Sequence, residues 1–485
     1  MAAGRMTCAP VPEHDQVTVR EGSAMTEDRR RRGAPGVDRA RGGRLTRREV
    51  LAAGAAGLAG AAVGAARLDR VAAPVRAAPR PRQLNIGVVS GVEIRGLKAI
   101  APMWDKETGV RLNLVEYPYA SLYEKMVTAF QANAATFDIV MLDDPWMPKF
   151  GAEGWLAPLD AAPFNLKRDP DIFPVVYDLG SWPPPSGPVP PGEGGKPRHL
   201  YAITLVGNVE LFMYRRDLIP SPPRTWDQVL SNATRLGNPG KQFYGFAMRG
   251  AKGNPIISQW FPILRAFGGR VFDDHWNVVF KSPESLAALK FFVGQLKAVA
   301  QPGADTADAA DRTRLVATGH AAQGSVWPAE ASDIVENPSV STVRGKVAYT
   351  VLPMGPAGKH TPMMGNWLLG IPKAAREKEW AYRFITWATS ASVQKPYAAA
   401  GGIPFRKSIL TDPGLNKRYP FFRAMADSLA APPFWRPRTT EWSAVETILG
   451  THVNAALAGG ESPEQAVDKA ATEITQHMRE AGYIK

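Results

Sequence analysis

The feature that most constrains the fold is an apolar stretch at residues 201–217, which reads YAITLVGNVELFMYRRD. A β-rich run breaks at Gly207-Asn208 and resumes at Leu211 before a charged stop. Glycine and a polar amide inside a buried strand mark a bend or a close backbone approach. We therefore expect the chain to pass here from one lobe to another, with a binding cleft at the crossing.

The segments before this stretch alternate between strand and helix. Residues 84–90, 110–117 and 137–142 read as strands, and residues 93–107 and 119–132 have the apolar spacing of helices. This order predicts an α/β fold with a parallel sheet, in which ligands gather at the carboxyl ends of the strands. Asp143, Asp144 and Trp146 directly follow the third strand.

The segments after it repeat the pattern. A helix is expected to start after Thr225 as cap, further helices are expected at 260–266, 282–300 and 308–318, and strands at 244–247, 321–327 and 346–352. Residues 362–372 form a second apolar strand with a Gly-Asn break, at Gly365-Asn366. Two helices end the chain, near 442–458 and 462–480, the last opened by Ser462 as cap and Pro463 in the first turn.

Residues 182–198 (WPPPSGPVPPGEGGKPR) are rich in proline and glycine. Such a composition is typical of segments without fixed secondary structure. We interpret them as an exposed insertion on the first lobe, because the patterns before and after belong to the same lobe. A domain linker is the alternative.

Residues 1–78 are expected to be a leader that is removed. Thr46-Arg47-Arg48-Glu49-Val50-Leu51 precedes a weakly apolar run rich in alanine and glycine, which resembles a twin-arginine export signal. A plain secretory signal or an amphipathic tail is the alternative. The run is too short and too rich in glycine for a stable membrane span.

Composition excludes several classes of function. Hydrophobic residues make up 45% and charged residues 21% of the chain, as in globular proteins. Part of the net charge of +13 belongs to the leader, and no basic groove with interleaved aromatic residues is visible, so nucleic acid is not an expected partner. Cys8, the only cysteine, lies in the leader, so the mature protein lacks a thiol nucleophile. No cofactor or metal is expected.

The order of these segments, with several motifs, resembles the family 1 extracellular solute-binding proteins of ABC importers. The motifs are FDIVMLDDPWMPKFGAEGWLAPLD, VELFMYRRDLI, RAFGGRVFDD, GKVAYTVLPMGP, GNWLLGIPKAAREKEWAYRFITWATS and SPEQAVDKAATEI. The resemblance implies a two-lobe α/β fold whose lobes close around a solute by hinge bending. It implies a first lobe at 83–205 and 368–434, a second at 209–364 and 441–485, and crossings near 205–209, 365–368 and 434–441.

The resemblance also implies where the ligand binds. The positions that match cleft residues of the family are Asp143, Asp144, Trp146, Asn208, Trp260, Trp327, Gly365, Asn366, Trp367, Arg438 and Trp442. Carboxylates, amides and aromatic faces suit sugars, which offer rows of hydroxyls and flat C–H faces. The acidic and basic first-lobe residues of the maltose-binding members are not reproduced one for one, so specificity for glucose polymers is not carried over.

Structural alternatives exist for several of these residues. Asp143 and Asp144 could cap the segment that follows, and Trp260 could belong to the core of the second lobe. Trp327 and Trp442 match stacking positions, so we expect ligand contact there, and Trp367 lies on an apolar strand that could face either way.

The expected function is therefore capture of a sugar or polyol for an ABC importer, by a monomer that partners membrane permease subunits and catalyses no reaction. A polyamine or other cationic solute is one alternative, since Asp143, Asp144 and Glu330 could hold a cation. An exported glycoside-acting enzyme is the other, since Asp143 with Glu330 or Glu441 could form a carboxylate pair.

Overall fold

The computed structural model describes residues 79–431 and 436–485, which belong to one compact unit that spans Arg76–Lys485. The leader, including Cys8 and the expected export signal, lies outside the described residues. Among the helices of the described residues, none has the length and apolar character needed to cross a membrane.

A five-stranded sheet with the order β2-β1-β3-β10-β6 forms the first lobe. Strands β1 (Gln83–Val89), β2 (Arg111–Tyr117) and β3 (Ile139–Asp143) run parallel, as their alternation with helices predicts. Strand β10 (Trp367–Gly370) pairs antiparallel with β3 and with β6 (Ala202–Val206), because it enters this sheet from the second lobe.

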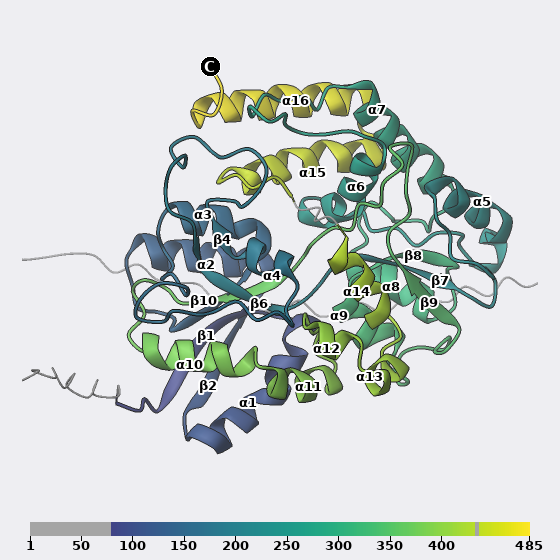
Figure 1. Cartoon of the computed structure of the whole chain (residues 1–485). Helices are drawn as coiled ribbons and strands as arrows, with labels where there is room; N and C mark the ends of the chain where they lie inside the picture. Colours follow the sequence, from purple (N-terminus) through teal and green to yellow (C-terminus); the bar gives the residue numbers. More distant parts are fainter. Residues whose placement is uncertain (1–78, 432–435) are drawn as a thin grey trace, which may run out of the picture. The chain divides into compact units, whose positions relative to one another are not determined.

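The connecting helices of this sheet form where the periodicity predicts them. Helix α1 (Arg95–Thr108) buries Leu97, Ile100 and Trp104, and ends at Gly109, whose positive φ of 69° suits a helix C-terminus. Helix α2 (Tyr119–Gln131) covers the opposite face of the sheet from α1 and from α10 (Lys378–Ala388) (Figure 1).

A three-stranded antiparallel sheet with the order β8-β7-β9 forms the second lobe. Its strands are β7 (Leu211–Arg215), β8 (Gln323–Val326) and β9 (Val347–Thr350). Around it lie α5 (Trp226–Leu236), α6 (Asn254–Ala266), α7 (Pro283–Lys290) with the π-helical turn Phe291–Leu296, and α8 (Ala309–Ala317). Residues 244–247 are not a strand, since Tyr244 and Phe246 form only single bridges, to Ala321 and Ala300.

The last two helices pack against each other beside α6 and α7. They are α15 (Trp442–Ala458) and α16 (Pro463–Glu480). The Ser462 side chain accepts from the N–H of Gln465, whose own side chain accepts from the N–H of Ser462, so a capping box opens α16. The expected pair of terminal helices is confirmed.

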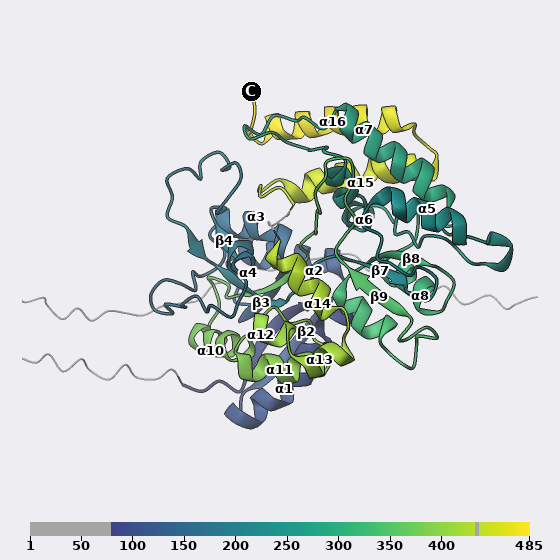
Figure 2. The same ribbon diagram turned by 45° about the vertical axis from the view of Figure 1, so that its right-hand side comes forward.

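Short elements complete the first lobe and the junction. They are α3 (Met147–Ala152), α4 (Pro174–Leu179), β4 (Ser181–Trp182), β5 (His199–Leu200), α9 (Pro328–Glu330), α11 (Ala391–Ala399), α12 (Lys407–Leu410), α13 (Pro413–Arg418) and α14 (Phe422–Ala430). Helix α14 falls in a range that the sequence assigns to the first lobe, yet it lies beside β7 and β9 of the second (Figure 2). The ring of Phe421, just before it, packs on Tyr349 of β9.

The chain changes sheets at both Gly-Asn breaks. Between Val206 and Leu211 it leaves the five-stranded sheet for the three-stranded one, and between Thr350 and Trp367 it returns. The expected third crossing, near 434–441, falls partly outside the described residues, which resume at Arg436.

Candidate functional site

A cavity of about 100 Å³ lies between the two sheets, beside both Gly-Asn breaks. From the first lobe, residues of a 3₁₀ turn (Val92–Ile94), α2, β3 and β10 line the cavity. From the second lobe, residues of the segment before α6, of α6 itself and of the start and end of α9 line it. The residues that line it are Glu93, Tyr119, Asp143, Asn208, Arg249, Asn254, Ser258, Trp327, Glu330, Gly365, Trp367 and Arg436.

Asp143 is held at the end of β3 by three groups. The Tyr119 hydroxyl donates to its Oδ2 at 2.9 Å, the backbone N–H of Asp144 donates to Oδ1 at 3.0 Å, and Arg436 Nη2 lies 3.5 Å from Oδ1. The capping role that the sequence suggested is therefore present, and the carboxylate lines the cavity as well. Burial raises the pKa of Asp143 to about 7, against the opposing effect of Arg436.

The two Gly-Asn breaks are bonded to each other. The N–H of Gly365 and the Nδ2 of Asn366 both donate to the backbone oxygen of Asn208, at 3.1 and 2.8 Å. Asn208 Oδ1 accepts from the backbone N–H of Ala329 in the second lobe at 3.2 Å. Asn208 therefore both joins the two breaks and lines the cavity with its amide.

Two indoles bound the cavity from opposite lobes. Trp367 on β10 meets Tyr119 and Trp146 edge-on, with ring centroids 5.9 and 5.7 Å apart. Trp327, at the end of β8, lies over Gly365, where a Cβ atom would approach the indole Cζ3 to 2.6 Å. Glycine at 365 is therefore what lets the Trp327 ring approach the crossing this closely.

Arg436 joins three carboxylates behind the cavity. Its Nη2 lies 3.5 and 3.4 Å from Asp143 and Asp144, and its Nη1 lies 3.7 Å from Glu446 of α15. These carboxylates raise the pKa of Arg436, which burial alone would lower, so its charge is retained. Burial raises the pKa of Glu446 even with Arg436 beside it.

Glu330 is positioned by a buried arginine of α8. Arg312, fully buried, bonds Glu330 Oε2 at 3.3 Å and Glu210 Oε1 at 3.1 Å. Its Nη1 also donates to Gln259 and Ser325, and Thr313 donates its hydroxyl to Glu330. One guanidinium therefore serves two carboxylates, and burial raises the pKa of Glu210.

The remaining charged groups at the cavity are Glu93 and Arg249. Burial, with the nearby Glu330 carboxylate as the next cause, raises the pKa of Glu93 to about 7. Arg249 is already engaged, since its Nε donates to Asp308 at 3.0 Å and its Nη1 to Ser258 at 2.6 Å.

Five of the sequence-predicted residues line the cavity and six do not. Those that line it are Asp143, Asn208, Trp327, Gly365 and Trp367. Four others lie behind the residues that line it: Asp144, Trp146, Asn366 and Arg438. Asp144 Oδ2 accepts from the N–H of Asn366 at 2.9 Å, and Arg438 donates to the backbone oxygens of Asp144 and Leu179. Trp260 and Trp442 are fully buried in the core of the second lobe, against Phe280 and Phe261.

Sequence reasoning did not select Glu93, Tyr119, Arg249, Asn254, Ser258 and Arg436 as site residues, and it named Glu330 only under the alternatives. Glu93 and Tyr119 follow the carboxyl ends of β1 and β2, a position typical of ligand sites in parallel sheets. Arg249 and Arg436 had no local pattern that distinguishes them from surface arginines.

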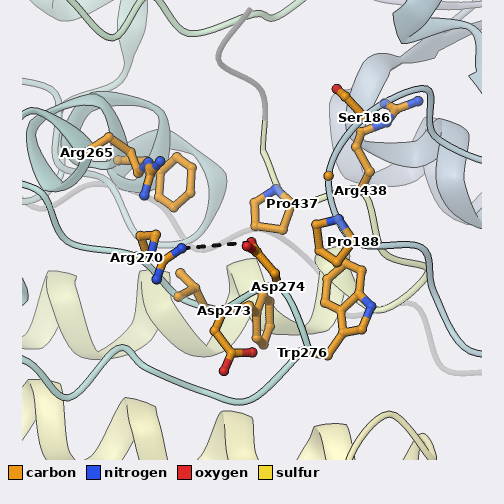
Figure 3. Close-up of a pocket in the computed structure, with 13 residues that line it drawn as sticks. Ser186, Pro188, Arg265, Arg270, Asp273, Asp274, Trp276, Pro437 and Arg438 are labelled. Carbon is orange, nitrogen blue, oxygen red and sulfur yellow. Dashed lines mark ion pairs between the residues drawn. The ribbon is translucent and has the colours of Figure 1, made fainter. Parts of the chain in front are cut away.

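A second, larger cavity of about 240 Å³ lies where the Pro/Gly-rich insertion meets the second lobe. Figure 3 shows Ser186 and Pro188 of the insertion opposite Arg270, Asp273 and Asp274. The insertion reaches the second lobe through Trp276, whose Nε1 donates to the oxygen of Val189 at 3.1 Å.

The insertion is ordered by two charged side chains rather than by secondary structure. Glu193, buried, accepts from the Nε1 of Trp182 at 2.9 Å and pairs with Lys196. Arg198 donates to the oxygens of Pro183 and Pro184. Residues 183–198 contain no helix or strand, but Trp182, the first residue of the expected insertion, belongs to β4, and Trp182 and Glu193 are buried rather than exposed.

Two α/β lobes with a cavity lined from both, and from the segments that join them, define a two-lobe binding protein. The sequence model for bacterial extracellular solute-binding proteins matches residues 90–395, and the chain belongs to this family.

Individual relatives agree along most of the chain. A probable amino-acid ABC transporter periplasmic-binding protein of Sinorhizobium fredii is 27% identical over 82% of this chain and 89% of its own length. The mannitol-binding protein of Pseudomonas aeruginosa is 26% identical over 83% and 94%. The solved solute-binding protein of Agrobacterium radiobacter in complex with ribitol has a TM-score of 0.73 and 27% identity, covering 82% of this chain and 99% of that one.

Proposed function

We propose that the chain captures a small carbohydrate, a sugar or polyol, in the cavity between its sheets and delivers it to the permease subunits of an ABC importer. The observation that carries the proposal is the lining of this cavity. Two indoles, an amide, and charged carboxylate and guanidinium groups converge there from both lobes. Aromatic faces suit the C–H surfaces of a sugar, and the charged groups form strong hydrogen bonds with hydroxyls.

The size of the cavity favours a monosaccharide or linear polyol over an oligosaccharide, since about 100 Å³ is well below the volume of sites for larger ligands. The names of two relatives, a mannitol-binding protein and a protein solved with ribitol, support the same class. Several net hydrogen bonds of about 0.5–1.5 kcal/mol each, with aromatic burial, suffice for micromolar affinity.

Closure of the two lobes around the solute is part of the proposal. The crossings at 205–209 and 365–368 are bonded to each other through Asn208 and also contribute to the cavity, so binding and closure are one event. Export by the twin-arginine-type leader would place the monomeric protein in the periplasm or on the outer face of the cell membrane.

A thermal-shift screen tests the proposal. Mannitol, ribitol, glucose and maltose are compared with putrescine, spermidine and free amino acids. A rise in melting temperature with sugars or polyols supports it, and a rise with polyamines or amino acids alone contradicts it. Turnover of a chromogenic glycoside would instead support a glycoside-acting enzyme.

A further inference from the structure

The charges around the interlobe cavity do not balance. Its surroundings hold the carboxylates of Glu93, Asp143, Asp144, Glu210, Asp308, Glu330 and Glu446 against the guanidinium groups of Arg249, Arg312, Arg436 and Arg438. Buried carboxylates need a cationic or hydrogen-bonding partner, because removal from water destabilises the ionised form.

The arginines do not supply the missing charge, because each guanidinium is already bonded to other acceptors, even though the Nε atoms of Arg312 and Arg436 have none. Arg312 is shared between Glu210 and Glu330, and Arg436 among three carboxylates. Arg249 is bonded to Asp308. Arg438 donates to two backbone oxygens, and burial lowers its pKa to about 10.

Glu93 and Glu330 are two carboxyl groups that line the cavity. They come from opposite lobes, on the 3₁₀ turn Val92–Ile94 and at the end of α9, two elements in contact with each other. Among the charged groups, Glu330 has the largest effect on the pKa of Glu93. Asp143, Arg249 and the Tyr397 hydroxyl are other titratable groups near Glu93. A hydrogen-bond donor of the solute could therefore bond to both Glu93 and Glu330.

We propose that the solute is a hydroxylated molecule that carries a protonated amine, an amino sugar or amino-polyol, with its ammonium group between Glu93 and Glu330. The inference rests on the proposed capture of a carbohydrate and narrows it to one class. Trp327 and Trp367 bound the same cavity and present aromatic faces, which attract an ammonium group as well as sugar C–H groups. Hydroxyls then bond to Asn208, Asp143 and Arg436.

Matched pairs of solutes test the inference by isothermal titration calorimetry. D-glucosamine is compared with D-glucose, and 1-amino-1-deoxy-D-sorbitol with D-sorbitol, at pH 7.5, with putrescine as an amine without hydroxyls. We expect each amine to bind at least tenfold more tightly than its neutral partner. For 1-amino-1-deoxy-D-sorbitol, whose amine stays protonated in this range, we also expect the amine preference to grow between pH 6 and pH 8, because the Glu93 carboxyl, with a pKa of about 7, then gives up its proton and accepts the ammonium group.

Two variants locate the effect. Glu93→Gln keeps the shape of the side chain and should reduce the amine preference at least fivefold, with little change for the neutral partner. Glu124→Gln changes an exposed carboxylate of α2 and should leave both affinities unchanged.

The outcomes separate this inference from the proposed function. Neutral members that bind as tightly as the amines overturn the inference and support carbohydrate capture. Binding of putrescine alone, or of no compound, overturns both. An amine preference that survives in Glu93→Gln overturns the position assigned to the ammonium group.

Discussion

Asn366 Nδ2 donates to the backbone oxygen of Asn208 at 2.8 Å, which bonds the segment that leaves the first lobe to the segment that returns to it. The two residues are 158 positions apart in the chain, and each follows a glycine. Asn366 is fully buried, so water cannot replace this bond. This amide therefore adds a buried side-chain bond to the backbone bonds that join the two crossings, such as the one from the N–H of Gly365 to the same oxygen.

Asn366→Ala should destabilise the protein by about 1–2 kcal/mol, because it removes this buried hydrogen bond. Urea unfolding followed by tryptophan fluorescence measures the loss. Asn113→Ala, which removes an exposed amide of β2, serves as the control and should change stability by less than about 0.5 kcal/mol. Equal losses in the two variants would show that the Asn366 bond has no special role.

Gly365→Ala should clash with Trp327, since the added Cβ would approach the indole to 2.6 Å. We expect a loss of about 1–3 kcal/mol from overpacking. In a Trp327→Leu background the ring is gone, so the same substitution should have a much smaller effect. A double-mutant cycle in urea measures this coupling. An unchanged penalty in the Trp327→Leu background would place the strain elsewhere.

Trp327→Ala alone tests the ligand-facing role of this indole. Trp327 is only 9% exposed and lies in the buried cluster of the second lobe, so the change should weaken solute binding at least tenfold and also lower the melting temperature of the unliganded protein. Thermal shift with and without a binding solute measures both quantities. Solute binding that is unchanged in this variant would show that the indole serves the core alone.

The bond from Trp276 to Val189 should slow release of the solute, since it joins the first-lobe insertion to the second lobe. Trp276→Phe removes the donor and keeps a ring that can still pack on Phe272 and Tyr483. We expect dissociation about two- to tenfold faster by stopped-flow fluorescence, as for one net hydrogen bond. Trp387→Phe removes an indole bond within the first lobe, to Glu107, and should not change the rate.

Arg312→Met should leave Glu210 and Glu330 without their buried partner and cost about 3–5 kcal/mol. Adding Glu210→Gln to this variant removes one uncompensated charge and should recover part of the stability. Urea unfolding at pH 7 measures both. No recovery in the double variant would mean that lost packing, rather than charge, causes the effect.

Glu93 should make the unliganded protein less stable as pH rises. Its pKa is raised to about 7 in the fold, so between its ordinary value of 4.5 and about 7 the folded state binds more protons than the unfolded state. Stability therefore falls across this range, by on the order of 1–3 kcal/mol, and the loss is complete above it.

Comparison of Glu93→Gln with the wild type isolates this effect. The variant should be about as stable as the wild type near pH 5 and more stable near pH 7.5, in unfolding titrations without solute. A difference that is constant with pH would show that the Glu93 carboxyl does not titrate in this range.

The order of strands and helices could be predicted because it depends on short-range patterns. The alternation at 84–142 predicts three parallel strands, and the cap at Ser462 predicts the start of α16. The expected strand at 244–247 was wrong, since its apolar residues form single bridges rather than a ladder. A short apolar run can be buried with or without pairing as a strand, and its sequence does not distinguish the two cases.

The cavity itself could be predicted only in part. Asp143, Asn208 and Gly365 stand at strand ends or breaks, which local sequence reveals, and all line the cavity. Trp260 and Trp442 could not be told from ligand-facing indoles, because a tryptophan on an apolar helix suits a core as well as a cleft. In the fold both are fully buried in the second lobe.

The sequence by itself determined the α/β class, the two points at which the chain changes sheets, and the export-signal pattern that lies outside the described residues. Periodicity, glycine breaks and caps act over a few residues and are legible without a fold. Only the tertiary structure decided which charges meet. Glu93, Glu330 and Arg436 lie hundreds of positions apart in the chain, and burial between two lobes gives them their common environment.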